Sequence, residues 1–277
     1  MVGSAYSSGV ETLKRAGIVS AAAEMRTILS ELTGISPLEI PLSHRELTAG
    51  EREKLKTVLD RRVMHEPLQY ILGKAYFFDL ELEVSPAVLI PRPETELLIE
   101  WVLEKLPQNG KLLDLGTGSG AIALAVAKHR PDAAVTAADL SAAALAVAER
   151  NAEKCGVSGL RFVRSDLFSA LAGECFDLVA ANLPYVPEAD RAELTPEVRD
   201  HEPGLALFSG TDGFDLLDRA GREVAAHLAP EGKAIFELDP RQTKRMSALL
   251  AASGFVCETL RDLAGRYRFV AGTLAAR

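Results

Sequence analysis

The sequence has few cysteines, no long hydrophobic run and no basic cluster at its start, and each shortage excludes a class of protein. Cys155, Cys175 and Cys257 are too few and too widely separated for a disulfide framework or a zinc site. No stretch approaches the roughly 20 consecutive apolar residues of a membrane-spanning helix. The N-terminus also lacks the basic cluster and apolar core of a signal peptide. We therefore expect no metal, no membrane association and a cytoplasmic location.

The charge of the chain disfavours nucleic acid as a ligand. Its net charge is −8, and residues 1–75 hold 10 Lys/Arg against 9 Asp/Glu, so that residues 76–277 carry −9. A protein that neutralises many phosphates usually presents a basic face. Such a face is not visible in the sequence, although a local patch assembled in three dimensions stays open. We expect no direct nucleic-acid partner.

Residues 1–75 are predicted to form a small helical domain. From Val19 to Leu32 apolar residues recur at helical spacing, and Gly34 follows as a stop signal. Thr48-Ala49-Gly50-Glu51 has the form of a capping box and predicts the start of a second helix. Prolines at positions 37, 41 and 67 separate these segments. A bundle of this size is too short to be the whole protein.

A linking β-hairpin is predicted over residues 76–94. Residues 76–84 end in an alternation of apolar and acidic side chains, which is typical of a strand with one face in water. Ser85-Pro86 interrupts this strand, and Ala87–Ile90 is expected to return as its partner.

Residues 95–277 alternate short apolar strands with helical patterns, which predicts a mostly parallel, doubly wound α/β sheet. The expected helices include Ile122–Lys128, Ala142–Lys154, Phe214–Leu228 and Gln242–Ala252. The loop Asp262–Gly265 between the last two strands is so short that it permits only a hairpin, so an antiparallel strand should join the sheet. The seven expected strands are Lys111–Leu115, Ala133–Ala138, Arg161–Val163, Leu178–Ala181, Lys233–Leu238, Phe255–Thr259 and Tyr267–Thr273.

A glycine-rich turn follows the first of these strands and opens a helix. In Asp114-Leu115-Gly116-Thr117-Gly118-Ser119-Gly120 the glycines let the backbone approach a ligand where a Cβ would collide. Asp139 ends the second strand roughly 20 residues later, where it can accept hydrogen bonds from ribose hydroxyls. The pattern predicts a nucleotide-like cofactor, but nicotinamide-binding proteins share it.

Two features favour S-adenosylmethionine as that cofactor. Asp114 precedes the first glycine by two positions, where this motif in methyltransferases carries an acidic residue that can face the charged methionine end. The terminal hairpin resembles that of the class I methyltransferase sheet. Asp166 and Leu167 likewise resemble the segment that contacts the adenine. The predicted cofactor site is Gly116, Thr117, Gly118, Ser119, Gly120, Asp139, Asp166, Leu167 and Asn182.

Asn182-Leu183-Pro184-Tyr185 ends the fourth strand, at the sheet edge where ligands bind. It resembles the (N/D)-P-P-Y motif of methyltransferases that modify exocyclic adenine nitrogens or glutamine amides, with Leu183 in place of the first proline. The acceptor nitrogen of an adenine or a glutamine amide is planar, and it is a poor nucleophile because its lone pair is delocalised. Asn182 Oδ1 and the Leu183 carbonyl can hold its two N–H bonds and favour the charge that develops in transfer.

The rest of the motif completes a predicted substrate site. Pro184 stiffens the turn, and Tyr185 can cover the flat face of the conjugated group. Asn182, Leu183, Pro184 and Tyr185 are therefore the predicted substrate-binding residues, and Asn182 and Tyr185 are the predicted catalytic ones.

Further blocks narrow the resemblance to one family. They are His65–Gly73, Leu89–Glu96, Glu202-Pro203 with Ala206-Leu207, and Gly210–Gly213. With the two motifs above, they resemble the peptide chain release factor N5-glutamine methyltransferase family across nearly the whole chain. The resemblance implies a class I methyltransferase sheet and a helical domain that recognises the release factor. It also implies S-adenosylmethionine as cofactor and the glutamine of a Gly-Gly-Gln motif as acceptor.

Several alternatives stay open at this point. An adenine-N6 methyltransferase acting on RNA or DNA would share the Asn182–Tyr185 motif. A nicotinamide-dependent oxidoreductase would share the glycine turn but leave that motif without a role, and a non-catalytic binding module would not need Asn182. Arg92 and Glu94 either line the pocket or brace a proline-rich turn. We expect a monomer, because the sequence has no strong interface signal.

Overall fold

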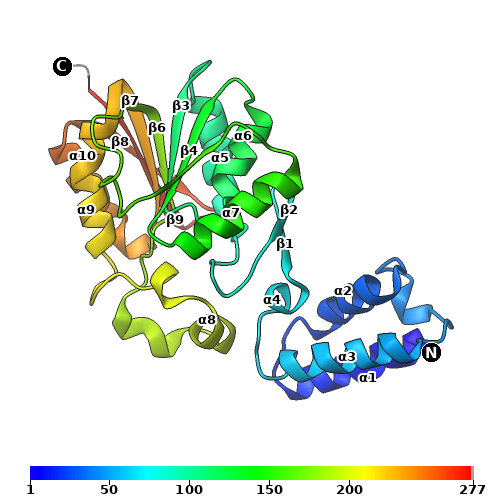
Figure 1. Ribbon diagram of the computed structural model, residues 1–277. Helices are drawn as coiled ribbons and strands as arrows, with labels where there is room; N and C mark the ends of the chain where they lie inside the picture. Colours follow the sequence, from blue (N-terminus) through cyan, green and yellow to red (C-terminus); the bar gives the residue numbers. More distant parts are fainter. Residues whose placement is uncertain (276–277) are drawn as a thin grey trace. The chain divides into compact units, whose positions relative to one another are not determined.

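The computed structural model describes residues 1–275, which fall into two compact units (Figure 1). The helical unit comprises Met1–Gly73 together with Thr195–His201, and the sheet unit comprises the other described residues. The chain therefore enters the sheet unit at Lys74, leaves it after Leu194 and returns at Glu202. The predicted boundary after residue 75 lies two residues further along. The predicted linker, residues 76–94, belongs to the sheet unit.

The helical unit packs its helices around an apolar core. Met25, Ile28 and Leu29, part of the periodic pattern in the sequence, have no exposed surface. The capping box predicted at Thr48 is confirmed, since Thr48 Oγ1 accepts from Glu51 N and Glu51 Oε2 accepts from Thr48 N. The elements are α1 (Val2–Arg15), α2 (Ala21–Thr33), the 3-10 helix η1 (Ile40–Leu42), α3 (Ala49–Arg62), α4 (Leu68–Leu72) and α8 (Pro196–His201).

A buried arginine attaches α8 to the other helices of this unit. Arg62 Nε donates to Glu24 Oε2 at 2.7 Å, and its NH2 group donates to Glu197 Oε1 at 3.1 Å. The guanidinium is almost fully buried, so both carboxylates are needed to compensate its lost hydration. Arg62 thereby ties α2, α3 and α8 together.

Replacing Arg62 by alanine is expected to lower the free energy of unfolding by about 2 kcal/mol. This value lies below the roughly 3–5 kcal/mol of a fully buried pair, because Glu197 retains 26% of its side-chain exposure. Urea titration of the full chain measures the change. Arg52→Ala is the matched control, since the ion pair that the Arg52 side chain forms with Glu46 is exposed. Equal effects of the two substitutions would contradict a central role for Arg62.

The sheet unit is built on a seven-stranded sheet with the order β5-β4-β3-β6-β7-β9-β8. The neighbouring strands β5, β4, β3, β6 and β7 are parallel, and β9 pairs antiparallel with both β7 and β8. The predicted fold class is confirmed, including the antiparallel hairpin at the end. The strands are β3 (Lys111–Leu115), β4 (Ala134–Asp139), β5 (Arg161–Arg164), β6 (Phe176–Ala181), β7 (Leu228–Glu237), β8 (Phe255–Arg261) and β9 (Tyr267–Leu274).

Helices cover both faces of this sheet (Figure 1). Leu112 of β3 packs in the core under α5, α6 and α7, whereas its neighbour Leu113 packs in the core under α9 and α10. Burial on both faces explains why the strands are continuously apolar. The elements are α5 (Thr95–Lys105), α6 (Ala121–His129), α7 (Ala142–Cys155), α9 (Asp215–Glu223), α10 (Thr243–Ala252) and the 3-10 helices η2 (Glu188–Glu193), η3 (Gly204–Ala206), η4 (Val224–His227) and η5 (Pro240–Gln242).

Two local predictions are corrected. The helix predicted over Phe214–Leu228 ends at Glu223, followed by η4 and the start of β7 at Leu228. The predicted strand Ala87–Ile90 does not form, because the segment before it already contains a complete hairpin. In that hairpin β1 (Lys74–Phe77) pairs with β2 (Leu80–Glu83).

The turn of this hairpin explains the error. Phe78 lies at its start with a φ of 55°, and its N–H donates to Glu96 Oε1. The alternating pattern therefore hides a two-residue turn within a single apparent strand. Pro86 and Pro91 flank the segment expected to form the second strand and lack the N–H groups of a strand ladder. Among residues 1–275, no helix has the length and apolar character needed to cross a membrane.

Candidate active site

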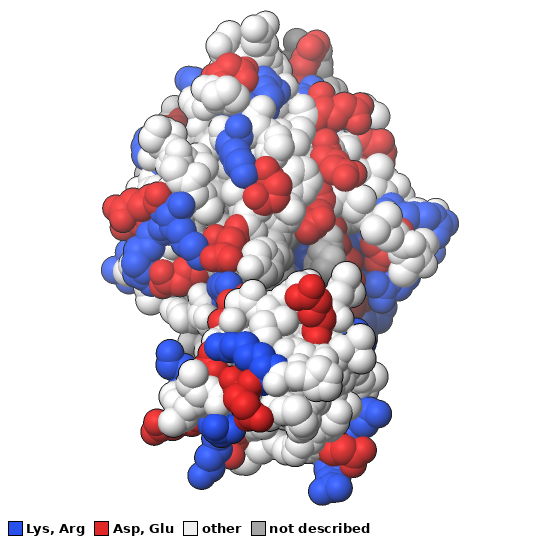
Figure 2. Space-filling view, turned by 90° about the vertical axis from the view of Figure 1, so that its right-hand side faces the viewer, with Lys and Arg blue, Asp and Glu red and all other residues white. Residues whose placement is uncertain are grey.

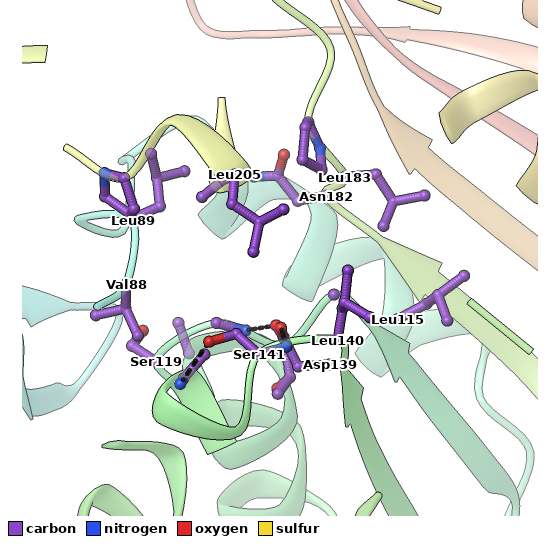
Figure 3. A pocket seen from close by; sticks show the side chains of 18 of the residues that line it. Val88, Leu89, Leu115, Ser119, Asp139, Leu140, Ser141, Asn182, Leu183 and Leu205 are labelled. Atoms are coloured by element: carbon purple, nitrogen blue, oxygen red, sulfur yellow. Dashed lines mark hydrogen bonds between the residues drawn. The ribbon is translucent and has the colours of Figure 1, made fainter. Parts of the chain in front are cut away.

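The carboxyl ends of the central strands border a cavity of about 330 Å³ (Figure 3). This volume falls within the range of small-molecule sites. Figure 3 shows Asp139 across the cavity from Asn182, with Val88 and Leu89 at the side and Leu205 pointing into the space. Every residue that lines the cavity belongs to the sheet unit.

The glycine-rich turn forms one wall of this cavity. Gly116 has a φ of 79° and Gly118 a φ of 55°, a region that disfavours side chains. A Cβ on Gly116 would also lie 2.8 Å from Leu183 Cδ2. The wall therefore needs glycine for its backbone conformation and for the close approach of the Asn182–Tyr185 segment.

Asp139 holds this wall from the end of β4. Its Oδ2 accepts from Gly118 N at 2.9 Å, and its Oδ1 accepts from Ser141 N at 2.8 Å. Burial raises the pKa of the Asp139 carboxyl above its usual range. The carboxylate lines the cavity while also bracing the turn, so it can serve a ligand and the loop at once.

Asp114 lies behind the turn and does not line the cavity. Its Oδ2 accepts from Thr117 Oγ1 at 2.6 Å and from Ala123 N at 3.1 Å. Its Oδ1 is buried without a hydrogen-bond partner among the described residues. Burial raises the pKa of Asp114 to about 7, so a nearby positive charge would stabilise its ionised form.

The segment after β5 contributes Asp166 and Leu167 to the cavity. Asp166 Oδ2 pairs with Arg219 at 3.0 Å, but both side chains are about half exposed, and such pairs contribute little. Leu167 is buried at a φ of 48°, and its carbonyl accepts from Ser165 Oγ at 2.6 Å. A left-handed leucine costs on the order of 1–3 kcal/mol, and such strain is concentrated at functional sites.

Asn182 stands at the end of a buried hydrogen-bond network. Its Nδ2 donates to Thr95 Oγ1 at 3.1 Å, and Thr95 Oγ1 donates to Glu237 Oε2 at 2.7 Å. Tyr185 donates weakly to Glu237 Oε1 at 3.5 Å. Asn182, Leu183 and Pro184 line the cavity.

Two predicted site residues, Tyr185 and Gly120, lie outside the cavity wall. The Tyr185 hydroxyl points into the buried network, and its carbonyl accepts from Gln242 Nε2 at 3.0 Å. A Cβ on Gly120 would lie 3.1 Å from Ala148 Cβ, so this glycine permits close packing of α6 against α7. The Tyr185 side chain therefore lies behind the wall that Asn182, Leu183 and Pro184 form.

Arg92 satisfies both of the interpretations offered for it. It lines the cavity and donates to Glu202 Oε1 at 2.6 Å. Glu202 is buried, and its other oxygen accepts from Ile90 N, so the pair also braces the loop. Glu94 lies outside the wall and pairs with Arg266 at 3.6 Å.

Three polar residues of the site were missed from sequence. Thr95 hydrogen-bonds to both Asn182 and Glu237. Asn151 on α7 donates to Ser119 O at 2.9 Å and to Glu83 O at 3.0 Å. One sequence feature could have indicated Glu237: it is a charged residue directly after the apolar strand residues 234–236. Residues 1–275 contain no group of three or more His, Cys, Asp or Glu that could hold a metal ion.

The strand order, the glycine turn after β3 and the Asn182 motif after β6 define a class I methyltransferase. Comparison with known families supports this class. The methyltransferase small domain matches residues 93–197, and the PrmC N-terminal domain matches residues 4–73.

Comparison with curated proteins identifies the family. The release factor glutamine methyltransferase of Gloeobacter violaceus is 42% identical over 90% of this chain and 89% of its own length. That of Deinococcus radiodurans is 39% identical over 93% of each chain. The chain belongs to the release factor glutamine methyltransferase family.

Solved structures of more distant proteins show the same fold. A methyltransferase from Pyrococcus furiosus is 16% identical, covers 82% of this chain and all of its own, and has a TM-score of 0.55. A 16S rRNA N2 G1207 methyltransferase from Thermus thermophilus is 21% identical, covers 73% of this chain and 49% of its own, and has a TM-score of 0.53. At these identities the likeness concerns the fold alone.

Proposed function

We propose that this chain transfers a methyl group from S-adenosylmethionine to the side-chain amide nitrogen (N5) of the glutamine in the Gly-Gly-Gln motif of release factors. The observation that carries the proposal is the placement of Asn182 and Leu183 on the wall of a cavity that the glycine turn also lines. Membership of the release factor glutamine methyltransferase family supports the same acceptor.

The residues present fit S-adenosylmethionine. Gly116 and Gly118 would let the backbone of the turn lie against the cofactor, Asp139 offers acceptors for hydroxyls, and Leu167 offers apolar cover. The unpartnered Oδ1 of Asp114 adds negative charge behind the turn, which suits a cationic ligand. When bound, S-adenosylmethionine supplies an electrophilic methyl group on a sulfonium.

Asn182 and Leu183 would prepare the acceptor nitrogen. Within residues 1–275, the Asn182 side chain hydrogen-bonds through Nδ2, to Thr95, and its Oδ1 has no partner. Oδ1 and the Leu183 carbonyl can accept the two N–H bonds of the glutamine amide and orient its nitrogen. Both acceptors gain strength as the nitrogen becomes positive, which favours the transition state over the ground state.

The proton that the nitrogen loses after transfer has no dedicated acceptor among the residues that line the cavity near Asn182. Water can accept it, because the methylated nitrogen is acidic while it carries positive charge. The apolar side chains of Val88, Leu89 and Leu205 shield the cavity and strengthen the polar contacts inside it.

Cofactor affinity is expected to fall as the pH decreases below about 7. Asp114 has a pKa of about 7 in the free protein, and burial also raises the pKa of Asp139. A cationic ligand favours the ionised carboxylates, so binding should release protons and should be strongest above this pH. Calorimetry at about pH 6 and pH 8, in buffers of different ionisation enthalpy, measures both effects. Proton uptake on cofactor binding would contradict the role given to the Asp114 and Asp139 carboxyls.

We also propose that the helical unit recognises the release factor, that the protein acts in the cytoplasm and that it acts as a monomer. The match of residues 4–73 to the PrmC N-terminal domain supports the first of these roles. Sedimentation of the full chain with and without a release factor tests both the oligomeric state and complex formation.

A test of the proposed function is mass spectrometry of a release factor after incubation with the full chain and S-adenosylmethionine. A mass increase of one methyl group, mapped to the Gly-Gly-Gln glutamine, is expected. A release factor whose glutamine is replaced by alanine is the control and should stay unmodified. An unmodified glutamine, while calorimetry shows bound cofactor, would refute the proposal.

An adenine-N6 methyltransferase remains the second candidate, because Asn182–Tyr185 suits that acceptor as well. The charge of the sheet unit argues against it. Figure 2 shows Lys and Arg interspersed with Asp and Glu on the face displayed, where they do not gather into one basic band. Methyl incorporation into RNA or DNA at physiological salt would favour this alternative.

A further inference from the structure

We propose that Thr95 and Glu237 form a positioning relay that fixes the orientation of the Asn182 amide toward the acceptor glutamine. This inference rests on the proposed function and assigns roles to two residues outside the Asn182–Tyr185 motif. Glu237 ends β7, Thr95 begins α5 and Asn182 follows β6, so three separate elements meet at this point.

The relay has a direction that follows from the donors and acceptors available. An ionised carboxylate can only accept, so Glu237 draws the single proton of the Thr95 hydroxyl toward itself, at 2.7 Å. Thr95 Oγ1 then has only lone pairs left for Asn182, and it accepts from Nδ2 at 3.1 Å. The amide oxygen of Asn182 is thereby left free for the substrate.

The opposite orientation of the Asn182 amide would weaken binding of the glutamine amide. If the Asn182 amide turned over, Nδ2 would face the N–H bonds of the glutamine, and two donors would oppose each other. A side-chain amide has no intrinsic preference between the two orientations, so its neighbours must decide. Thr95 is the neighbour that hydrogen-bonds to the Asn182 side chain among residues 1–275.

Burying the Glu237 carboxyl at this position costs free energy. It is only 1% exposed, and its second oxygen has just the long contact to Tyr185 at 3.5 Å. The charged groups around it are Arg268 on β9, which pairs with Asp262 at 3.6 Å, and Glu94 directly before α5. A buried carboxyl with so little compensation reduces stability, so a role in the site explains it better than a role in folding.

The relay should respond to pH in a particular way. Burial raises the pKa of Glu237 to about 7. A protonated Glu237 can donate to Thr95 Oγ1, which lets the Thr95 proton turn toward Asn182 and favours the reversed amide. Activity should therefore be full above this pH and should decrease as the pH falls through it.

The first experiment compares Thr95→Val with Thr95→Ser. Valine keeps the shape but removes the hydroxyl, so we expect kcat on a release factor to fall about 30-fold. The dissociation constant of S-adenosylmethionine, measured by calorimetry, should change less than about twofold. Thr95→Ser keeps the hydroxyl and should restore kcat to within about threefold. Thr136→Val, which alters a buried threonine on β4, is the matched control and should leave kcat unchanged.

The second experiment follows kcat from about pH 6 to pH 8. The wild type should lose about tenfold in kcat at the lower pH, as a carboxyl with a pKa near 7 predicts. Glu237→Gln should show a low kcat without this dependence, because its amide does not titrate. A structural role alone would not produce this loss of pH dependence. If Glu237→Gln does not fold, the comparison of Thr95→Val with Thr95→Ser still tests the relay.

The outcomes separate the relay from the proposed function. An inactive wild type with bound cofactor would refute the proposed function and the relay with it. An active wild type together with a normal kcat for Thr95→Val, or an unaltered pH dependence in Glu237→Gln, would overturn the relay alone.

Discussion

Asn182→Ala is expected to lower kcat for glutamine methylation by about 100- to 1000-fold, the range observed when one preorganised transition-state contact is removed. Its Oδ1 is the free acceptor on the cavity wall, and alanine has no atom to replace it. The affinity for S-adenosylmethionine should change less than about threefold, because Asp139 and the glycine turn stay in place. Single-turnover kinetics with a release factor, together with calorimetry, measures the two effects.

A second asparagine provides the contrast for this test. Asn151 is fully buried and makes its hydrogen bonds to Glu83 and Ser119, so Asn151→Ala should lower the free energy of unfolding by about 2 kcal/mol. Asn182→Ala should leave it nearly unchanged. Near-normal turnover by Asn182→Ala would remove this residue from the mechanism.

Asp139→Ala is expected to weaken S-adenosylmethionine binding by about 100-fold, which matches the loss of one or two charge-assisted hydrogen bonds. The carboxylate lines the cavity and also holds Gly118 N and Ser141 N. Its removal therefore takes away a cofactor contact and loosens the wall behind it. Calorimetric titration of the cofactor measures the change in dissociation constant.

The matched control is Asp177→Ala. Asp177 also accepts from a backbone N–H, that of Lys111 at 2.7 Å, but at the start of β3, away from the carboxyl ends that border the cavity. Its replacement should leave the dissociation constant within about twofold. If the two variants bound the cofactor equally well, Asp139 would have no part in the site.

The sequence predicted those parts of the site that follow from local pattern. Alternating strands and helices indicate a doubly wound sheet, and ligands of such sheets bind at the carboxyl ends of the strands. The glycine turn and Asn182 directly follow apolar strands, and Asp139 ends one, so their convergence follows from topology. Leu167 and Leu183 could be placed for the same reason.

The network behind Asn182 could not be predicted in this way. Thr95 and Glu237 are separated by 142 positions in the chain, and Thr95 and Asn182 by 87. Neither contact leaves a periodic trace in the sequence. The inward direction of the Tyr185 hydroxyl depends on the same network.

The sequence by itself determined the class of fold, the glycine turn and the acceptor motif, because strand periodicity and strand ends are local properties. Only the tertiary structure decided that Arg62 joins α8 to the helical unit and that 74–83 closes as its own hairpin. It alone also showed that the buried Glu237 carboxyl is linked through Thr95 to the Asn182 amide. The physical reason is that these features depend on hydrogen bonds and burial between distant segments, which form only when the whole chain packs.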